Sequence, residues 1–205
     1  MKRAVFFYAV LISSFVSSVP GLMAQKHETP EKALEVASLL EPNLPEIKEL
    51  PVKVEADWSR PYLLTGEGGG VLVVPSIDLT GLSDVKDGQE KGLGYLWMLK
   101  VAPSKNGKSR SLEELRMVDV YHEDNVIKLS LYTMSLRKEG EKLEMRLYGK
   151  DKKPLVKSTL SEYKLSSTVP LELDAEMNEV GADLYVHLFG THRGTIKISE
   201  AESSG

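Results

Sequence analysis

The chain has no cysteine among its 205 residues, so it can form no disulfide bond and offers no thiol nucleophile. The absence also excludes the lipid-modified cysteine of an anchored lipoprotein. Small exported eukaryotic domains usually depend on disulfide bonds, whereas this chain must rely on an ordinary hydrophobic core. The lack of cysteine therefore favours a bacterial protein.

An excess of positive charge is also missing, because 26 Lys and Arg stand against 30 Asp and Glu, a formal charge of −4. Loss of residues 1–24, which contain Lys2, Arg3 and no acidic residue, would move the charge to −6. An acidic chain has no electrostatic attraction to the phosphate backbone. We therefore expect no nucleic-acid partner.

Long hydrophobic runs are absent except at the start of the chain. Lys2 and Arg3 precede an apolar stretch over 4–19, and Ala24 supplies a small residue at a plausible cleavage position. This is the layout of a secretory signal peptide over residues 1–24. An uncleaved membrane anchor is the alternative, but the stretch is shorter than the ~20 residues that span a bilayer. We expect a periplasmic or extracellular protein whose mature chain has no transmembrane segment.

Residues 25–51 form an acidic, proline-rich extension. Thr29 is suited to cap a helix and Pro30 to occupy its first position. The sequence predicts a short amphipathic helix over 30–41, followed by an extended linker that packs on the main domain or reaches a partner. The apolar face of the helix comprises Ala33, Val36, Ala37 and Leu40.

From residue 52 to 199 the hydrophobic period changes to two, which indicates strands with one buried face. We predict an all-β fold, an antiparallel β-sandwich that is immunoglobulin-like or similar, with a closed β-barrel around an apolar lumen as the alternative. Residues 200–205 are small and polar, and we expect them to be a disordered tail. Alternation predicts strands at 127–132, 143–148, 169–174, 184–189 and 196–198, while runs that are apolar on both faces predict central strands at 71–74 and 95–99.

One segment, 102–109, partly matches a phosphate-binding loop. Gly107, Lys108 and Ser109 fit that motif, but Ala102 stands where its first glycine belongs. A phosphate loop also leads into a sustained helix, and none is predicted here. We interpret Asn106 and Gly107 as a tight turn between strands.

Two histidines near the end of the chain, His187 and His192, are candidate binding residues. We place His187 on a strand and His192 near the tip of the following turn, which would separate them by roughly 10 Å. That distance is unsuited to two ligands of one ion, so we predict no metal site.

Trp58 and Tyr62 follow the linker and are candidates for a surface that stacks on a sugar or peptide. The alternative is that they cover an edge of the sheet. No nucleophile elbow or distinctive carboxylate pair is present, so we assign no catalytic residue and no cofactor.

These features favour an exported, non-enzymatic module that binds an envelope protein, peptide or glycan through residues such as Trp58, Tyr62, His187 and His192. A carrier of small ligands with a barrel lumen is the second hypothesis. A hydrolase or metal-dependent enzyme is the third, because active sites in all-β folds assemble from residues far apart in sequence.

Overall fold

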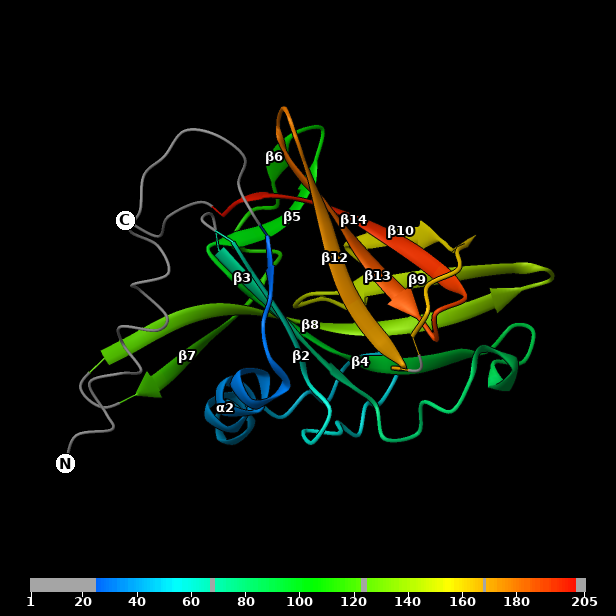
Figure 1. Cartoon of the computed structure of the whole chain (residues 1–205), viewed down its shortest axis with the longest axis horizontal. Helices are drawn as coiled ribbons and strands as arrows, with labels where there is room; N and C mark the ends of the chain where they lie inside the picture. The colour runs from blue at the N-terminus through cyan, green and yellow to red at the C-terminus, as the bar shows by residue number, and fades with distance from the viewer. Residues whose placement is uncertain (1–24, 67–68, 123–124, 168, 202–205) are drawn as a thin grey trace.

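The period-two alternation corresponds to two antiparallel β-sheets in the computed structural model (Figure 1). The structure describes residues 25–66, 69–122, 125–167 and 169–201. The predicted signal peptide and most of the predicted disordered tail lie outside these residues. The predicted fold class, antiparallel all-β with one short helix near the N-terminus, is confirmed.

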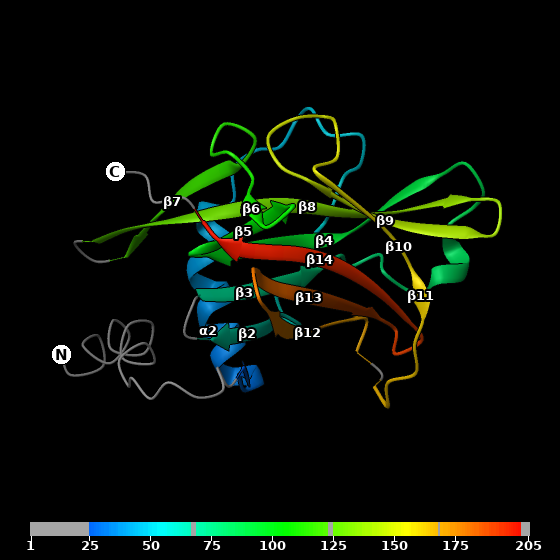
Figure 2. The same ribbon diagram turned by 90° about the horizontal axis from the view of Figure 1, so that it is seen from above.

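The first sheet has eight strands, seven of them in the order β1-β2-β3-β4-β8-β9-β10. β7 pairs with residues 125–131 of β8, on the side opposite β4 and next to the segment that pairs with β9. The β7–β8 hairpin projects from the body as an arm (Figure 2). The strands are β1 (Lys26–His27), β2 (Tyr62–Gly66), β3 (Gly69–Pro75), β4 (Glu90–Leu99), β7 (Arg116–His122), β8 (Asn125–Glu139), β9 (Lys142–Tyr148) and β10 (Val156–Thr159).

The second sheet has six strands, with the order β12-β13-β14-β5-β6 and β11 paired to β14. The chain passes from one sheet to the other three times, between β4 and β5, between β6 and β7 and between β10 and β11. The first and last of these connections are a single residue long and form two corners of the fold. The strands are β5 (Val101–Lys105), β6 (Lys108–Ser109), β11 (Ser161–Glu162), β12 (Leu171–Asn178), β13 (Gly181–Leu188) and β14 (His192–Glu200).

The main core lies between the two sheets. Leu96 and Met134 of the first sheet meet Leu184, Val186 and Ile196 of the second, and all five side chains are fully buried. On the side opposite the two corners β12 lies next to β2. No backbone ladder joins β12 to β2 among the described residues, so the two sheets form an incompletely closed sandwich.

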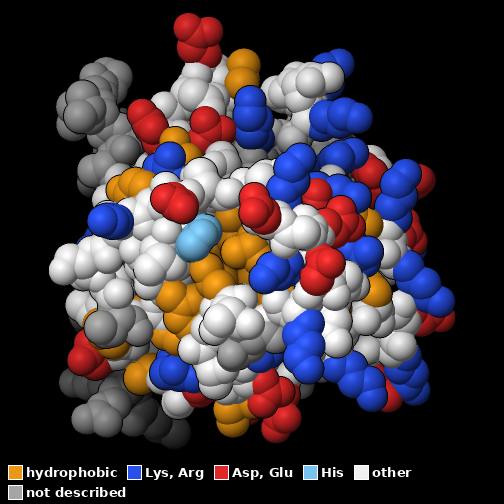
Figure 3. Space-filling view, turned by 90° about the vertical axis from the view of Figure 1, so that its right-hand side faces the viewer, with side chains coloured by type: hydrophobic (Ala, Val, Ile, Leu, Met, Phe, Trp, Pro, Cys, Tyr) orange, Lys and Arg blue, Asp and Glu red, His pale blue; other side chains and the backbone are white. Residues whose placement is uncertain are grey.

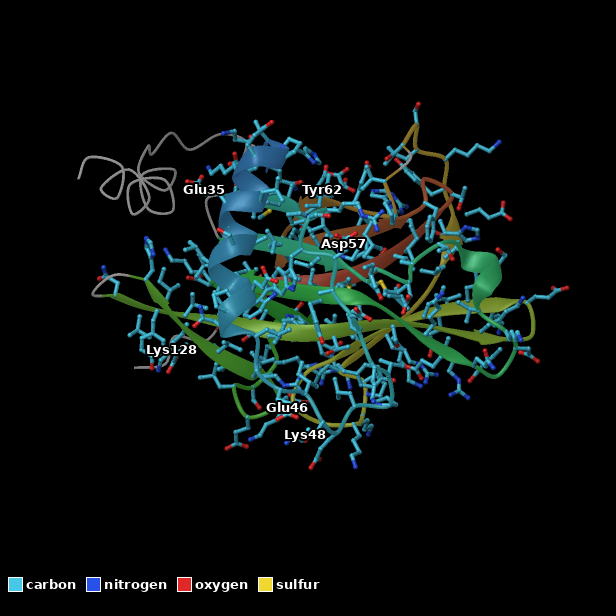
Figure 4. The ribbon with its side chains drawn as sticks, turned by 90° about the horizontal axis from the view of Figure 1, so that it is seen from below. Glu35, Glu46, Lys48, Asp57, Tyr62 and Lys128 are labelled. Atoms are coloured by element: carbon cyan, nitrogen blue, oxygen red, sulfur yellow. The ribbon has the colours of Figure 1, made fainter. Side chains whose placement is uncertain are left out.

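A second core covers the outer face of the first sheet. Helix α2 (Pro30–Leu40) is capped by Thr29, whose hydroxyl accepts a hydrogen bond from the Lys32 amide, and the short 3₁₀ helix η2 (Glu41–Asn43) follows it. The helix and linker pack across the strands (Figure 4). Trp97 of β4 points into this second core and not between the sheets. Ala33, Ala37 and Leu40 form the buried side of the helix.

The segment that resembles a phosphate loop is the β5–β6 hairpin. Asn106 and Gly107 have φ values of 55° and 77°, which is the left-handed conformation of a tight hairpin turn. Residues 111–115 form only a turn before β7 begins, so no helix follows the motif. The 3₁₀ helix η3 (Leu82–Asp84) and α2 are both far too short to cross a membrane, and no other helix in the described ranges is long and apolar enough to do so.

Candidate functional site

Tyr62, one of the predicted binding residues, lies at the border where β2 faces β12. The Tyr62 hydroxyl is 2.7 Å from His27 Nδ1, and His27 Nε2 lies 3.8 Å from Asp174 Oδ1. Figure 4 shows Tyr62 beside the strands of the second sheet. Strand β1 therefore connects the two sheets through side chains at a border that no backbone ladder closes.

His187 occupies the outer face of β13, directly between Glu172 of β12 and Arg193 of β14. The Tyr163 ring covers it at a centroid distance of 4.8 Å, so that only 3% of His187 is exposed. Burial lowers the pKa of His187, with the Asp174 carboxylate opposing this effect. A covered, neutral imidazole is poorly placed for proton transfer with a ligand.

Arg193 contacts two aromatic rings on the same outer face of the second sheet. Its guanidinium carbon lies 4.7 Å from the Tyr163 ring centroid and 4.4 Å from that of Tyr185, so both rings stack on the cation. The Tyr185 hydroxyl in turn donates a hydrogen bond of 2.9 Å to Glu176. We call this surface the outer aromatic face, which comprises Tyr163, Glu172, Asp174, Tyr185, His187 and Arg193.

The other two predicted residues lie elsewhere. His192 is the first residue of β14, not part of the turn, and it pairs with Leu188. Because His187 and Leu188 are consecutive in one strand, His187 and His192 belong to opposite faces of the sheet. Trp58 is half-buried and packs against the second core, in the same turn as Asp57 (Figure 4). The structure thus places Trp58 over the outer face of the first sheet.

An apolar pocket of about 370 Å³ opens between the sheets beside β1. β2 and β3 supply one wall, and β12, β13 and β14 supply the other. The side chains that form these walls also belong to the hydrophobic core, and the principal ones are at most 8% exposed. The principal apolar lining residues are Leu64, Val71, Ala182, Leu184 and Ile198.

The rim of the pocket combines apolar and polar groups. Met177 and Val180, from the β12–β13 hairpin, are 47% and 63% exposed. Gln25 lies at the rim, where its Oε1 accepts a 2.9 Å hydrogen bond from the Ala175 amide. Glu200 is the single acidic residue among the described lining residues, which include no Lys or Arg.

The opposite end of the molecule carries a network of charges around Glu90. Its carboxylate accepts hydrogen bonds of 2.5 Å from Ser135 and Tyr148 and pairs with Arg146 at 3.1 Å. Burial and the Glu90 carboxylate raise the pKa of Tyr148 to about 12. Figure 3 shows Lys and Arg interleaved with Asp and Glu around an apolar centre on this end. On this end Glu90 pairs with Arg137 and Arg146, and Glu144 pairs with Arg146.

Within the described ranges, no group of three or more His, Asp and Glu side chains is placed to hold a metal ion. Compared with known protein families, curated proteins and solved structures, the chain matches none of them. The assignment of function therefore depends on the geometry of the pocket and of the outer aromatic face.

Sequence reasoning did not identify the pocket or Arg193. The pocket walls come from segments more than 100 residues apart, and each wall residue has the ordinary pattern of a buried strand. Arg193 has a stronger signal in retrospect. It lies opposite His187 across the turn at Phe189 and Gly190, and Gly190 is the turn signal that the sequence carries.

Proposed function

We propose that this protein is an exported, non-catalytic binding protein that holds a small apolar molecule in the pocket between its two sheets. The observation that carries the proposal is the apolar pocket of about 370 Å³, which falls within the ~300–1,000 Å³ common for ligand sites. Export is supported by the basic start and the apolar run of residues 1–24.

The lining supports an apolar ligand in particular. Val71, Leu184 and Ile198 present hydrocarbon to the pocket, and apolar cavities of this kind take up apolar molecules because water hydrates them poorly. Each Å² of apolar ligand surface removed from water contributes roughly 25 cal/mol. The exposed Met177 and Val180 extend this surface to the mouth, where a ligand would enter.

The proposal is tested by displacement of an environment-sensitive apolar fluorophore from the purified protein. Ala182 lies in the wall at 6% exposure, so Ala182→Phe would fill the pocket and should lower the affinity at least about tenfold. Ala182→Ser keeps the volume and is the matched control. Circular dichroism shows whether each variant is folded. A folded Ala182→Phe that binds as tightly as the wild type would refute the pocket as the site.

The outer aromatic face supports a second candidate, the binding of a glycan or peptide from the cell envelope. Tyr163 and Tyr185 flank Arg193, and aromatic rings beside charged groups suit both ligand types. Crosslinking in the native envelope, with wild type and Arg193→Ala compared, tests this candidate. The loss of a reproducible neighbour in the variant would support it, and an identical set of neighbours would contradict it.

A further inference from the structure

Gln25 is held in place by both sheets. Its side-chain oxygen accepts a hydrogen bond from the Ala175 amide of β12, which also donates to Asp174 Oδ1 at 2.8 Å. The next two residues pair with β2, Lys26 with Thr65 and His27 with Leu64. In Figure 1 this segment runs beside β2 and β12 toward α2. Gln25 is thus a fixed part of the pocket rim and not a passing linker residue.

Ala24, the small residue expected before the signal-peptide cut, directly precedes Gln25. A cut at this bond would leave the described contacts of Gln25 intact and make it the first residue of the mature chain. A cut after Gln25 would remove the hydrogen bond to Ala175. The anchored segment therefore favours cleavage between Ala24 and Gln25.

We propose that Gln25 is a modification site, and that the mature protein begins with pyroglutamate at this position. The inference rests on the export and cleavage proposed above, but not on the ligand. In the reaction the free α-amine attacks the side-chain amide carbon, a new C–N bond closes a five-membered lactam, and the original amide nitrogen leaves as ammonia. No oxidant, reductant or second substrate is required.

Two features of the fold favour this product. The Ala175 amide donates to the oxygen that gains negative charge during the attack, as a donor in an oxyanion hole does. That oxygen remains in the lactam and can keep the hydrogen bond. Cyclisation also removes the positive charge of the α-amine, whose ordinary pKa is near 8, from the rim of a mainly apolar pocket.

The test begins with the full-length chain expressed with its leader in a secreting host. The exported protein is analysed by intact mass and by N-terminal sequencing, before and after treatment with a pyroglutamyl peptidase. We expect a chain that starts at residue 25, is lighter by one ammonia and can be sequenced only after the treatment. Gln25→Glu is the matched control, because its carboxylate lacks the leaving amide and should keep a free amine.

A second measurement follows the rate of cyclisation after a specific protease releases Gln25 from a fusion. Ala175→Pro removes the amide that donates to both Gln25 and Asp174, and spares the ladder because this amide of edge strand β12 points away from β13. It should slow ammonia loss roughly tenfold. An equal rate in the variant would overturn the role assigned to Ala175. A free Gln25 on the exported protein would overturn the modification alone, whereas a different or absent cut would overturn the proposed cleavage as well. Fluorophore binding in the pocket, measured on the same protein, tests the proposed ligand separately. Its failure can therefore be told apart from failure of the cleavage or of the modification.

Discussion

Glu28 illustrates how a single buried carboxylate holds the N-terminal segment. Its side chain is 2% exposed, lies 3.1 Å from Lys26 Nζ and 3.2 Å from Lys32 Nζ, and accepts a 2.8 Å hydrogen bond from Thr65. Burial raises the pKa of Glu28, but the hydrogen bonds and the two ammonium groups together lower it below its ordinary value of 4.5. The charged form is therefore favoured by folding.

The first prediction concerns this group. Because its folded pKa is lowered, Glu28 stabilises the protein above pH 4.5, and the contribution is lost as pH falls through the folded pKa. We expect Glu28→Gln to reduce the free energy of unfolding by about 1–3 kcal/mol at pH 7 and by less at pH 3. Urea unfolding at the two pH values measures this. Glu46→Gln, in an exposed pair with Lys48, serves as the control and should change little.

His187 gives a second prediction in a different pH range. Burial lowers its pKa, while Asp174 and Glu172 oppose and Arg193 and His27 assist this lowering. The unfolded imidazole therefore binds protons more readily, and stability is lost as pH falls below about 6.5 toward the folded pKa. His187→Phe, which cannot be protonated, should flatten the dependence of the melting temperature on pH in this range. An equally steep dependence in the variant would assign the effect to other groups.

Among the elements, the β5–β6 hairpin shows how one turn can imitate a functional motif. Asn106 and Gly107 reverse the chain, and Gly107 contacts Val180 of the neighbouring hairpin, since an added Cβ would lie 3.3 Å from the Val180 Cβ. Lys108 is exposed, and its side chain belongs to a two-residue strand, not to the start of a helix. The resemblance to a phosphate loop is thus a consequence of turn chemistry.

A paired substitution in this hairpin gives the third prediction. Gly107→Ala places a side chain at φ 77° and against Val180, and should cost about 1–2 kcal/mol of stability. Lys108→Ala removes an exposed charge and should leave both stability and ligand binding unchanged. Thermal unfolding of the two variants checks the pair. A loss of binding in Lys108→Ala alone would contradict the interpretation as a simple turn.

On the scale of the whole molecule, the first sheet separates two cores. One lies between the sheets and contains the pocket, and the other lies under α2 and the linker. Trp97 belongs to the second core and is 1% exposed, so its fluorescence reports on the packing of the helix. The two cores share strands but no buried side chain, because successive residues of a strand point to opposite faces.

The fourth prediction tests this separation. Ala37→Asp would bury a carboxylate between α2 and the sheet and should cost about 3 kcal/mol, with a red shift of tryptophan fluorescence. Leu34→Asp puts the same residue on the exposed side of the helix, where Leu34 is 41% exposed, and should have little effect. We expect both variants to retain their β-sheet circular dichroism. Simultaneous loss of all β structure in Ala37→Asp would show that the cores unfold together.

The sequence alone determined the local structure, because local structure depends on neighbouring residues. Alternation predicted β8, β9, β13 and β14, the capping pair Thr29 and Pro30 predicted α2, and Asn106–Gly107 predicted the turn. The predicted strand at 169–174 instead begins at Leu171 and continues to Asn178, where it pairs with Gly181 across a tight hairpin.

Only the tertiary structure decided which of these elements meet. The pairing of β14 with β5, the border between β2 and β12, and the position of Gln25 on Ala175 join residues separated by up to 150 positions. A pocket is the space that such walls leave between them, and ordinary valine, leucine and isoleucine carry no local sign of it. His187 and His192, in contrast, are close in the sequence but lie on opposite faces of the sheet because of strand geometry.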